Sequence, residues 1–441
     1  MRLDPSVQFR DNQRMRSSRA LKFGAIFIFI AVFATAFVYP LRNNKKVGNL
    51  IKVAKKASLR LSKDNLAQAL TDKAVIYQFP TEMDLPVDGT LSRDKKVHAI
   101  IQYAFDSKLQ ESMEKLMASY KPDYGAFVAM DAKSGRVLSI VSYVRDPVSK
   151  DPALQENMAF KATFPSASVF KLVTASAAIA DHRFSPDSII PYTGRNHTLY
   201  RSNVLHPKTN RWTNHISLKQ AFAKSINTVF GRIGAFSVGS AEMREYAGRF
   251  GFNRTISADF KMEEGHAAIP DDPNDAWGIA EASSGYTREN TMSPIQGALM
   301  AAAIVNDGVM MEPYLVDQVF SEEGVSIYEA EPKIASVSVD PKTAEEMRSL
   351  MNETVVRGTS RKSFRGFFHG GLKNLNVGGK TGSLTGTAPP GKYDWFVGYA
   401  DNGNQKIAVS ALTIHKTVWR VKSSYLARKA IESYFQSALR E

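Results

Sequence analysis

The 441-residue sequence contains no cysteine. A thiolate nucleophile, a disulfide framework and a cysteine-based zinc site are therefore excluded, and any covalent catalysis must use another nucleophile. Acidic residues are also few, because 43 Asp and Glu stand against 57 Lys and Arg, for a net charge of +14. This surplus suits anionic surroundings such as lipid headgroups, nucleic acid or an acidic polymer. With 44% hydrophobic residues, the chain is long enough for one large globular core or two ordinary ones.

One apolar run near the N-terminus, residues 23–39, carries no charge and is 17 residues long. It is just long enough to cross hydrocarbon as a helix, and several Arg and Lys precede it. We expect 1–22 to be a cytoplasmic basic tail and 23–39 to be a transmembrane signal anchor. The small residues Ala34, Thr35 and Ala36 also fit a cleavage site, an alternative that the sequence leaves open. Basic residues follow the run as well, so charge does not fix its orientation.

The rest of the chain divides by composition. Residues 40–122 are Lys-rich and contain a short helical pattern at 108–117, which predicts a juxtamembrane stalk or pedestal. At Asp123 the composition changes to two apolar strands around a turn at 132–135, where the main domain, 123–441, is expected to begin. Helical spacing follows at 168–180, 218–235 and 294–305, then strand patterns at 375–384, 394–400 and 406–415, and an amphipathic helix at 423–439. This order predicts an α+β fold in which helices flank an antiparallel sheet built from both ends of the domain, preceded by one N-terminal transmembrane helix.

Three short motifs in this domain combine hydroxyl, amine and amide side chains. Ser168 and Lys171 lie three residues apart at the start of a helical pattern, so that both face the same side of the helix. A buried lysine has a lowered pKa and can take the proton from a serine hydroxyl, and the N–H groups at a helix start stabilise negative charge.

The second motif places Ser225 and Asn227 in a turn between helices, facing a cleft. The third, Lys380-Thr381-Gly382 followed by Ser383, lies on a predicted strand whose lysine and hydroxyls can receive a carboxylate, with a glycine where substrate passes close to the strand. Each motif is weak alone, since similar triplets occur by chance on helix surfaces, turns and strand edges.

Together and in this order, the motifs S-x-x-K, S-x-N and K-T-G resemble those of the penicillin-binding, serine-active D,D-peptidase family. Four further segments match that family in kind: 122–142, 293–316, 351–366 and 394–400. The resemblance implies a penicillin-binding transpeptidase fold over most of 123–441. Ala167 departs from it, because many larger members have glycine directly before the serine.

The resemblance also implies the roles of the site residues. Ser168 would attack the carbonyl between the last two D-alanines of a peptidoglycan stem peptide, expelling D-alanine and leaving a peptidyl ester, and Lys171 would act as base. Ser225 and Asn227 would relay a proton and hold the substrate backbone. Lys380, Thr381 and Ser383 would receive the terminal carboxylate of the substrate, and Gly382 would leave space for the substrate against the strand. The backbone N–H groups of Ser168 and Ser383 would form an oxyanion hole. A β-lactam would acylate the same serine, and no metal or organic cofactor is expected.

Several alternatives stay open at this point. A D,D-carboxypeptidase differs from a D,D-transpeptidase only in using water instead of an amine to attack the ester; the S-x-N motif and the predicted single anchor favour transpeptidase. A serine β-lactamase of class A would need a glutamate and an asparagine four residues on, and no such pair occurs between Asn227 and Lys380. A non-catalytic β-lactam sensor or scaffold is a further alternative.

The chemistry also suggests partners and a location. A peptidoglycan substrate would place everything after residue 39 on the extracytoplasmic or periplasmic side of the cytoplasmic membrane. A glycosyltransferase of wall synthesis is a possible partner. No recognition motif supports nucleic acid, and anionic lipid accounts better for the basic flanks of 23–39.

Overall fold

The computed structural model describes residues 60–71, 79–87, 96–145 and 157–438. Within these ranges no helix is both long and apolar enough to span a membrane. The predicted anchor at 23–39 lies outside the described residues, as does the basic tail before it.

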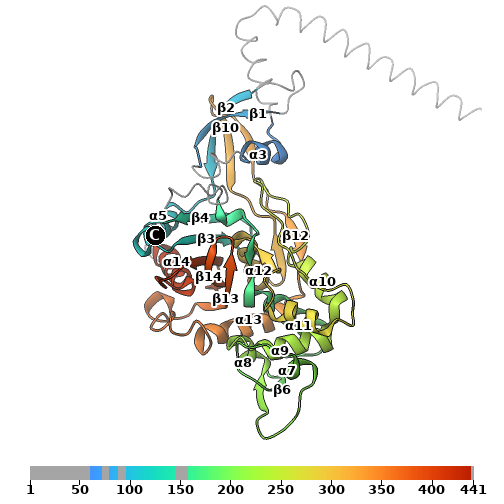
Figure 1. Cartoon of the computed structure of the whole chain (residues 1–441). Coiled ribbons are helices and arrows are strands. Elements are labelled where there is room, and N and C mark those ends of the chain that lie inside the picture. Colours follow the sequence, from blue (N-terminus) through green and yellow to red (C-terminus); the bar gives the residue numbers. More distant parts are fainter. Residues whose placement is uncertain (1–59, 72–78, 88–95, 146–156, 439–441) are drawn as a thin grey trace, which may run out of the picture.

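A five-stranded antiparallel sheet with the strand order β13-β14-β15-β3-β4 forms the centre of the molecule (Figure 1). The two ends of the domain meet in it because β15 pairs with β3, with Ala411 opposite Phe127. This confirms the predicted antiparallel sheet and the predicted hairpin near its start. The strands are β3 (Tyr124–Asp131), β4 (Val137–Val144), β13 (Asn376–Thr387), β14 (Pro390–Asp401) and β15 (Lys406–His415).

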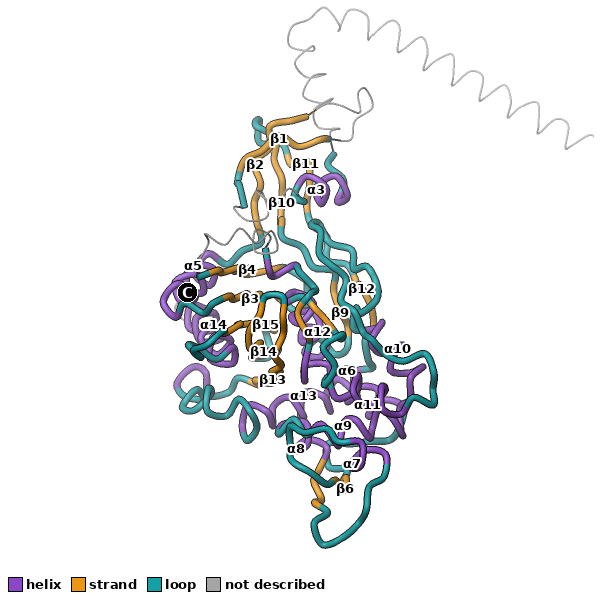
Figure 2. The backbone as a smooth tube through the Cα atoms, in the orientation of Figure 1, coloured by secondary structure: helices purple, strands orange, loops and turns teal. Residues whose placement is uncertain are grey.

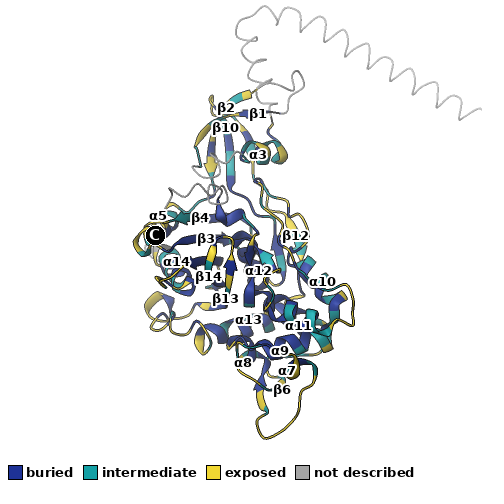
Figure 3. Cartoon of the chain, in the orientation of Figure 1, coloured by how far each residue is buried: buried dark blue, intermediate teal, exposed yellow. Residues whose placement is uncertain are grey.

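Helices cover both faces of this sheet, so its strands are apolar on both sides (Figure 3). On β14, Phe396 packs in the cluster that contains α5 (Ser107–Tyr120) and α14 (Ser423–Ala438). Its neighbours Trp395 and Val397 face the opposite way, toward α12 (Pro294–Val305), whose twelve residues are all buried. The sheet is therefore the middle layer of three, which fixes the position of its edge strand β13.

A helical region lies beside β13 (Figure 2). The predicted helix at 168–180 begins with a 3-10 turn, η3 (Ala167–Phe170), which continues into α6. The pattern at 218–235 is not one helix: it breaks at Ser225, whose φ of 58° lies in the left-handed region. The region contains α6 (Lys171–Asp181), α7 (Arg201–Leu205), α8 (Leu218–Ala223), α9 (Asn227–Ile233), a π-helical turn η4 (Gly234–Val238), α10 (Gly239–Arg249), α11 (Ala276–Ser284) and α13 (Pro341–Val356).

A smaller four-stranded sheet, ordered β1-β2-β10-β11, lies at the opposite end of the molecule from the hairpin of β6 (Ile189–Tyr192) and β7 (Asn214–Ser217) (Figure 1). It combines β2, from the segment predicted as a stalk, with β10, from the predicted main domain. From that same stalk segment, α5 packs on the central sheet. The remaining elements are α3 (Lys63–Ala69), β1 (Glu82–Pro86), β2 (Lys96–Tyr103), β5 (Phe164–Pro165), β8 (Thr291–Met292), β9 (Val309–Met311), β10 (Val316–Ser321), β11 (Ser326–Glu329), β12 (Ile334–Val337), and the 3-10 turns Met158–Phe160 and Gly370–Leu372.

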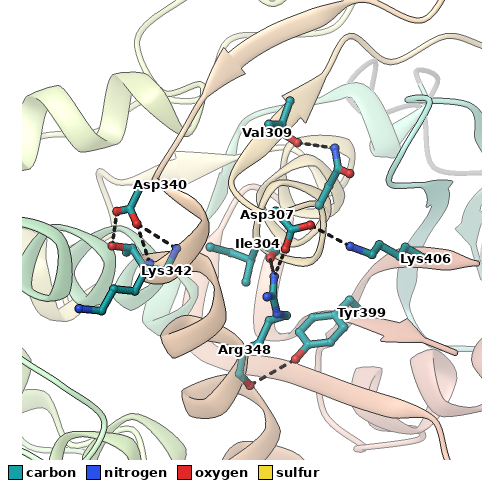
Figure 4. A network of polar contacts seen from close by, with 10 residues as sticks. Ile304, Asp307, Val309, Asp340, Lys342, Arg348, Tyr399 and Lys406 are labelled. Atoms are coloured by element: carbon teal, nitrogen blue, oxygen red, sulfur yellow. Dashed lines mark hydrogen bonds and ion pairs between the residues drawn. The ribbon is translucent and has the colours of Figure 1, made fainter. Parts of the chain in front are cut away.

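A polar network ties the layers together beyond the C-terminal end of α12 (Figure 4). Asp307 accepts hydrogen bonds from Arg348 on α13 at 2.8 Å and from Lys406 on β15 at 3.2 Å. Arg348 also donates to the carbonyl of Ile304, and its own carbonyl accepts from the Tyr399 hydroxyl on β14. One carboxylate thus links a helix end, a second helix and the sheet.

Candidate active site

The turn that carries Ser168 is held in an unusual backbone conformation. Ala167 directly before it has φ of 48°, the left-handed region that glycine adopts at little cost. Gly285 lies against this turn: a Cβ added there would be 1.9 Å from the Ala167 oxygen and 3.2 Å from the Ser168 nitrogen. A glycine at this position, which the resemblance implies, would adopt the same backbone at lower cost than Ala167 does.

Lys171 begins α6 one turn after Ser168 and is fully buried. Its Nζ lies 2.8 Å from Ser168 Oγ, 2.8 Å from Asn227 Oδ1 and 2.5 Å from the Ser284 carbonyl oxygen. Burial, and next the charge of Lys380, lower the pKa of Lys171 well below its usual range. A neutral amine has two N–H groups, and the two oxygens of Asn227 and Ser284 can only accept. The lone pair is then left for the Ser168 hydroxyl.

Ser225 and Asn227 form the second side of the site. The left-handed backbone at Ser225 ends α8 and turns the chain into α9, which begins at Asn227. The amide of Asn227 is oriented by its neighbours, because Nδ2 donates to the His197 carbonyl at 3.1 Å while Oδ1 accepts from Lys171. The motif therefore lies between two helices, as the sequence predicts, and contacts the first motif directly.

Lys380 on β13 is buried and points back toward Ser225, to whose Oγ it donates at 2.9 Å. Burial lowers its pKa to about 7. Because β13 is an edge strand, one side of its backbone is unpaired and faces the helical region. At Gly382 the strand passes so close to the serine turn that an added Cβ would lie 3.2 Å from the Ser166 oxygen.

A cleft of about 630 Å³ connects the three motifs. Its lining includes six of the predicted residues, Ser168, Ser225, Asn227, Thr381, Gly382 and Ser383. The other two are buried lysines that contact this lining: Lys171 reaches Ser168 and Asn227, and Lys380 reaches Ser225. The structure thus brings together all eight predicted site residues.

Other groups at the site belong to none of the three sequence motifs. The Ser284 carbonyl and Gly285 come from the end of α11, and the Thr359 hydroxyl lies 2.6 Å from that of Thr381. Backbone groups and single threonines are not recognisable in sequence, so only the fold could place them here. In the described ranges, no group of three His, Cys, Asp or Glu is arranged to hold a metal ion.

Comparison with known proteins agrees with this geometry. Residues 125–433 match the family described as the penicillin binding protein transpeptidase domain. The peptidoglycan D,D-transpeptidase PbpA of Mycolicibacterium smegmatis is 27% identical over 320 residues, which cover 66% of this chain and 62% of that protein. The chain therefore spans somewhat less than two thirds of the length of the curated relatives that it matches first.

Two solved structures show the same fold. The D,D-transpeptidase domain of a peptidoglycan glycosyltransferase from Eggerthella lenta superimposes with a TM-score of 0.63 at 24% identity, covering 77% of this chain and 83% of that one. The penicillin G acyl-enzyme complex of penicillin-binding protein A from Mycobacterium tuberculosis gives a TM-score of 0.58 at 24% identity, covering 79% and 82%. With a family match that extends over more than half of its length, this chain belongs to the penicillin-binding-protein transpeptidase family.

Proposed function

We propose that this chain is a peptidoglycan D,D-transpeptidase that works through a Ser168 acyl-enzyme and is acylated by β-lactams at the same serine. The observation that carries the proposal is the 2.8 Å contact between Ser168 Oγ and the Nζ of a buried Lys171 whose pKa is lowered. A serine hydroxyl becomes a nucleophile when such a base takes its proton. Relatives named D,D-transpeptidase and a penicillin acyl-enzyme structure within the same fold support the assignment.

The contacts support the following reaction. Lys171 takes the Ser168 proton as Oγ attacks the carbonyl between the two terminal D-alanines, and Ser225 passes a proton to the leaving amine. The Lys380 ammonium, 2.9 Å from Ser225 Oγ, replaces that proton. The backbone N–H groups of Ser168 and Ser383 stabilise the oxyanion, while Thr381 and Ser383 receive the terminal carboxylate.

The proposal extends to the placement of the chain. Residues 23–39 anchor it in the cytoplasmic membrane behind a basic tail at 1–22. The segment 40–122 forms the pedestal together with β10 and β11, and its α5 belongs to the layer that covers the central sheet. The 123–441 domain lies outside the cytoplasm beside its peptidoglycan substrate. A glycosyltransferase of wall synthesis supplies the strands that it cross-links. A reporter fused to the C-terminus tests this topology, and activity of a cytoplasm-only reporter would overturn it.

The test of the chemistry uses the full-length protein in detergent with fluorescent penicillin, beside Ser168→Ala. Intact mass follows both incorporation and release of the label. Persistent labelling that is lost in Ser168→Ala supports the proposal, rapid release indicates a β-lactamase, and no labelling of the folded wild type indicates a non-catalytic scaffold.

A D,D-carboxypeptidase remains the second candidate, because water and an amine attack the same ester. Stem peptide supplied with and without an acceptor amine separates the two, since only a transpeptidase diverts a substantial part of the acyl group to the amine.

A further inference from the structure

A hairpin, residues 189–217, which we call the basic hairpin, lies at the end of the molecule opposite the small sheet (Figure 1). Its strands β6 and β7 pair with Ile190 opposite Ile216, and a long loop that contains α7 joins them. From 188 to 241 the sequence contains seven Arg and Lys but no Asp or Glu. This part of the surface therefore carries a local excess of positive charge. Four of the cations belong to the basic hairpin: Arg195, Arg201, Lys208 and Arg211.

These four cations are exposed, and three of them have no acidic partner (Figure 3). The charge of Arg201 interacts with that of Glu281 on α11. The structure shows no hydrogen bond or ion pair between the side chains of Arg195, Lys208 or Arg211 and any other described residue. Their positive charges are therefore available to a ligand.

The loop also presents an aromatic ring to solvent. Among the described residues, Trp212 is the most exposed large hydrophobic side chain, at 70%. A tight turn fixes its backbone, because Asn210 Oδ1 accepts from the Trp212 N–H at 2.8 Å and the Asn210 N–H donates to the Thr213 hydroxyl at 3.0 Å. The Arg211 guanidinium lies 4.9 Å from the centre of the indole ring. A guanidinium covers one face of such a ring, so the exposed ring keeps its other face for a partner.

The basic hairpin begins at the catalytic cleft. The carbonyls of Asn196 and His197 accept hydrogen bonds from the backbone N–H and the side-chain amide of Asn227, at 2.9 and 3.1 Å. His197 itself lines the cleft. The surface thus continues from the cleft onto the basic hairpin, and a polymer with one branch in the cleft would lie beside this loop.

We propose that the basic hairpin binds the glycan strand of peptidoglycan, outside the catalytic cleft. The inference rests on the proposed function, which brings one stem peptide of that strand into the cleft. Such a strand is a chain of pyranose sugars, and its other stem peptides carry free carboxylates. The exposed face of Trp212 suits the C–H face of a pyranose ring. The side chains of Arg195, Lys208 and Arg211 suit the carboxylates.

Two other anionic partners fit this surface less well. In the proposed topology, the small sheet lies toward the membrane because its strands β1 and β2 are the nearest to the anchor in sequence. The basic hairpin at the opposite end then points away from lipid (Figure 1). A polymer of phosphodiesters would need the cations but not the ring of Trp212, whereas a sugar chain with carboxylates uses both.

The experiment measures co-sedimentation of the full-length protein, in detergent, with insoluble peptidoglycan. The protein is first acylated with penicillin, so that stem peptides cannot occupy the cleft and binding reports the rest of the surface. Peptidoglycan is supplied both with its attached phosphate polymers and after their removal by hydrofluoric acid. Soluble glycan strands freed of stem peptides serve as a competitor that offers only sugars.

We expect the wild type to bind peptidoglycan that lacks phosphate polymers, less tightly in added salt, and free glycan strands to compete. Trp212→Ala should lower the affinity about fivefold or more, as the loss of an aromatic anchor does. Lys208→Gln/Arg211→Gln should lower it about three- to tenfold, the effect of two exposed charge pairs. The matched control, Lys342→Gln/Lys373→Gln, removes two exposed cations elsewhere and should bind like the wild type. The rate of penicillin acylation verifies folding, because none of these residues lines the cleft.

Equal binding by the wild type and the folded basic-hairpin variants would overturn the inference, as would an equal loss in the matched control or no binding by the wild type at low salt. Sedimentation only with peptidoglycan that keeps its phosphate polymers would also overturn it and assign the surface to those polymers. Acylation by penicillin would leave the proposed function intact in each case. Failure of penicillin to acylate Ser168 would instead refute the proposed function, and the unacylated protein in the same assay would still decide whether the basic hairpin binds the strand.

Discussion

Gly285→Ala tests whether the wall behind the serine turn positions the nucleophile. The added Cβ would lie 1.9 Å from the Ala167 oxygen, and contacts below 3.0 Å force a shift, so the turn must move by about 1 Å. A misplacement of about 1 Å at a reacting group costs on the order of 100-fold in rate. Gly285 also has φ of 65°, where alanine costs about 1–2 kcal/mol, and overpacking adds about 1–3 kcal/mol.

The assay is the second-order rate constant of acylation by fluorescent penicillin, with folding at the assay temperature verified by denaturant unfolding. Gly324→Ala is the control: Gly324 has φ of 77° but nothing within 4 Å of an added Cβ, and it lies in the turn between β10 and β11, away from the cleft. It should lose stability from the backbone alone and keep its acylation rate. The reasoning is refuted if folded Gly285→Ala is acylated within about threefold of the wild-type rate.

Three further predictions concern charge. Lys171→Met should lower the acylation rate constant by about 10²–10⁴-fold, the usual contribution of a positioned base, and an undiminished rate would remove Lys171 from that role. Acylation should decline as pH rises through about 7, because Lys380 then loses the charge that receives a carboxylate and the proton that it passes to Ser225. Lys380→Arg keeps its charge at every pH but cannot give up a proton, so its acylation should be slower throughout and should lose this decline. Burial opposes ionisation of Asp307, but hydrogen bonds from Lys406 and Arg348 outweigh it and hold its pKa below 3.8. Asp307→Asn should therefore cost about 0.5–1 kcal/mol in urea unfolding at neutral pH, with the difference lost as pH falls through that lowered pKa.

Sequence patterns predicted the layers of this fold and the residues of its site, but the two predictions used different kinds of pattern. Apolar periodicity located the central strands and α12, because burial on one or both faces dictates residue type. The site residues came from motif resemblance, since spacing alone does not show that Lys380 reaches Ser225 across 155 positions. The polar S-x-N motif predicted the turn between α8 and α9, whereas the apolar pattern at 218–235 runs through it, because a left-handed serine interrupts no hydrophobic pattern.

The small sheet was beyond sequence reasoning for a topological reason. Its strand β2 precedes the central sheet in the chain, whereas its partner β10 follows α12, and pairing at that separation leaves no local signal. Three lysines that line the cleft were missed likewise: Lys362, Lys392 and Lys422 come from three separate segments, each of which resembles an ordinary solvated surface.

The two buried lysines lead us to expect that the proposed site favours anionic substrates. Lys171 and Lys380 are both fully enclosed, and the charge of Lys380 adds to burial in lowering the pKa of Lys171. Two adjacent buried cations are costly, so one amine stays neutral and is available as base. A carboxylate that enters beside Thr381 stabilises the remaining positive charge on Lys380 and raises the pKa of that group. Substrate binding then favours a neutral Lys171 beside a charged Lys380, the protonation states that acylation needs. A neutral analogue would occupy the cleft without this effect. Acylation by a penicillin ester, which lacks the free carboxylate, should accordingly be slower than by the parent penicillin, and the difference should shrink in Lys380→Met.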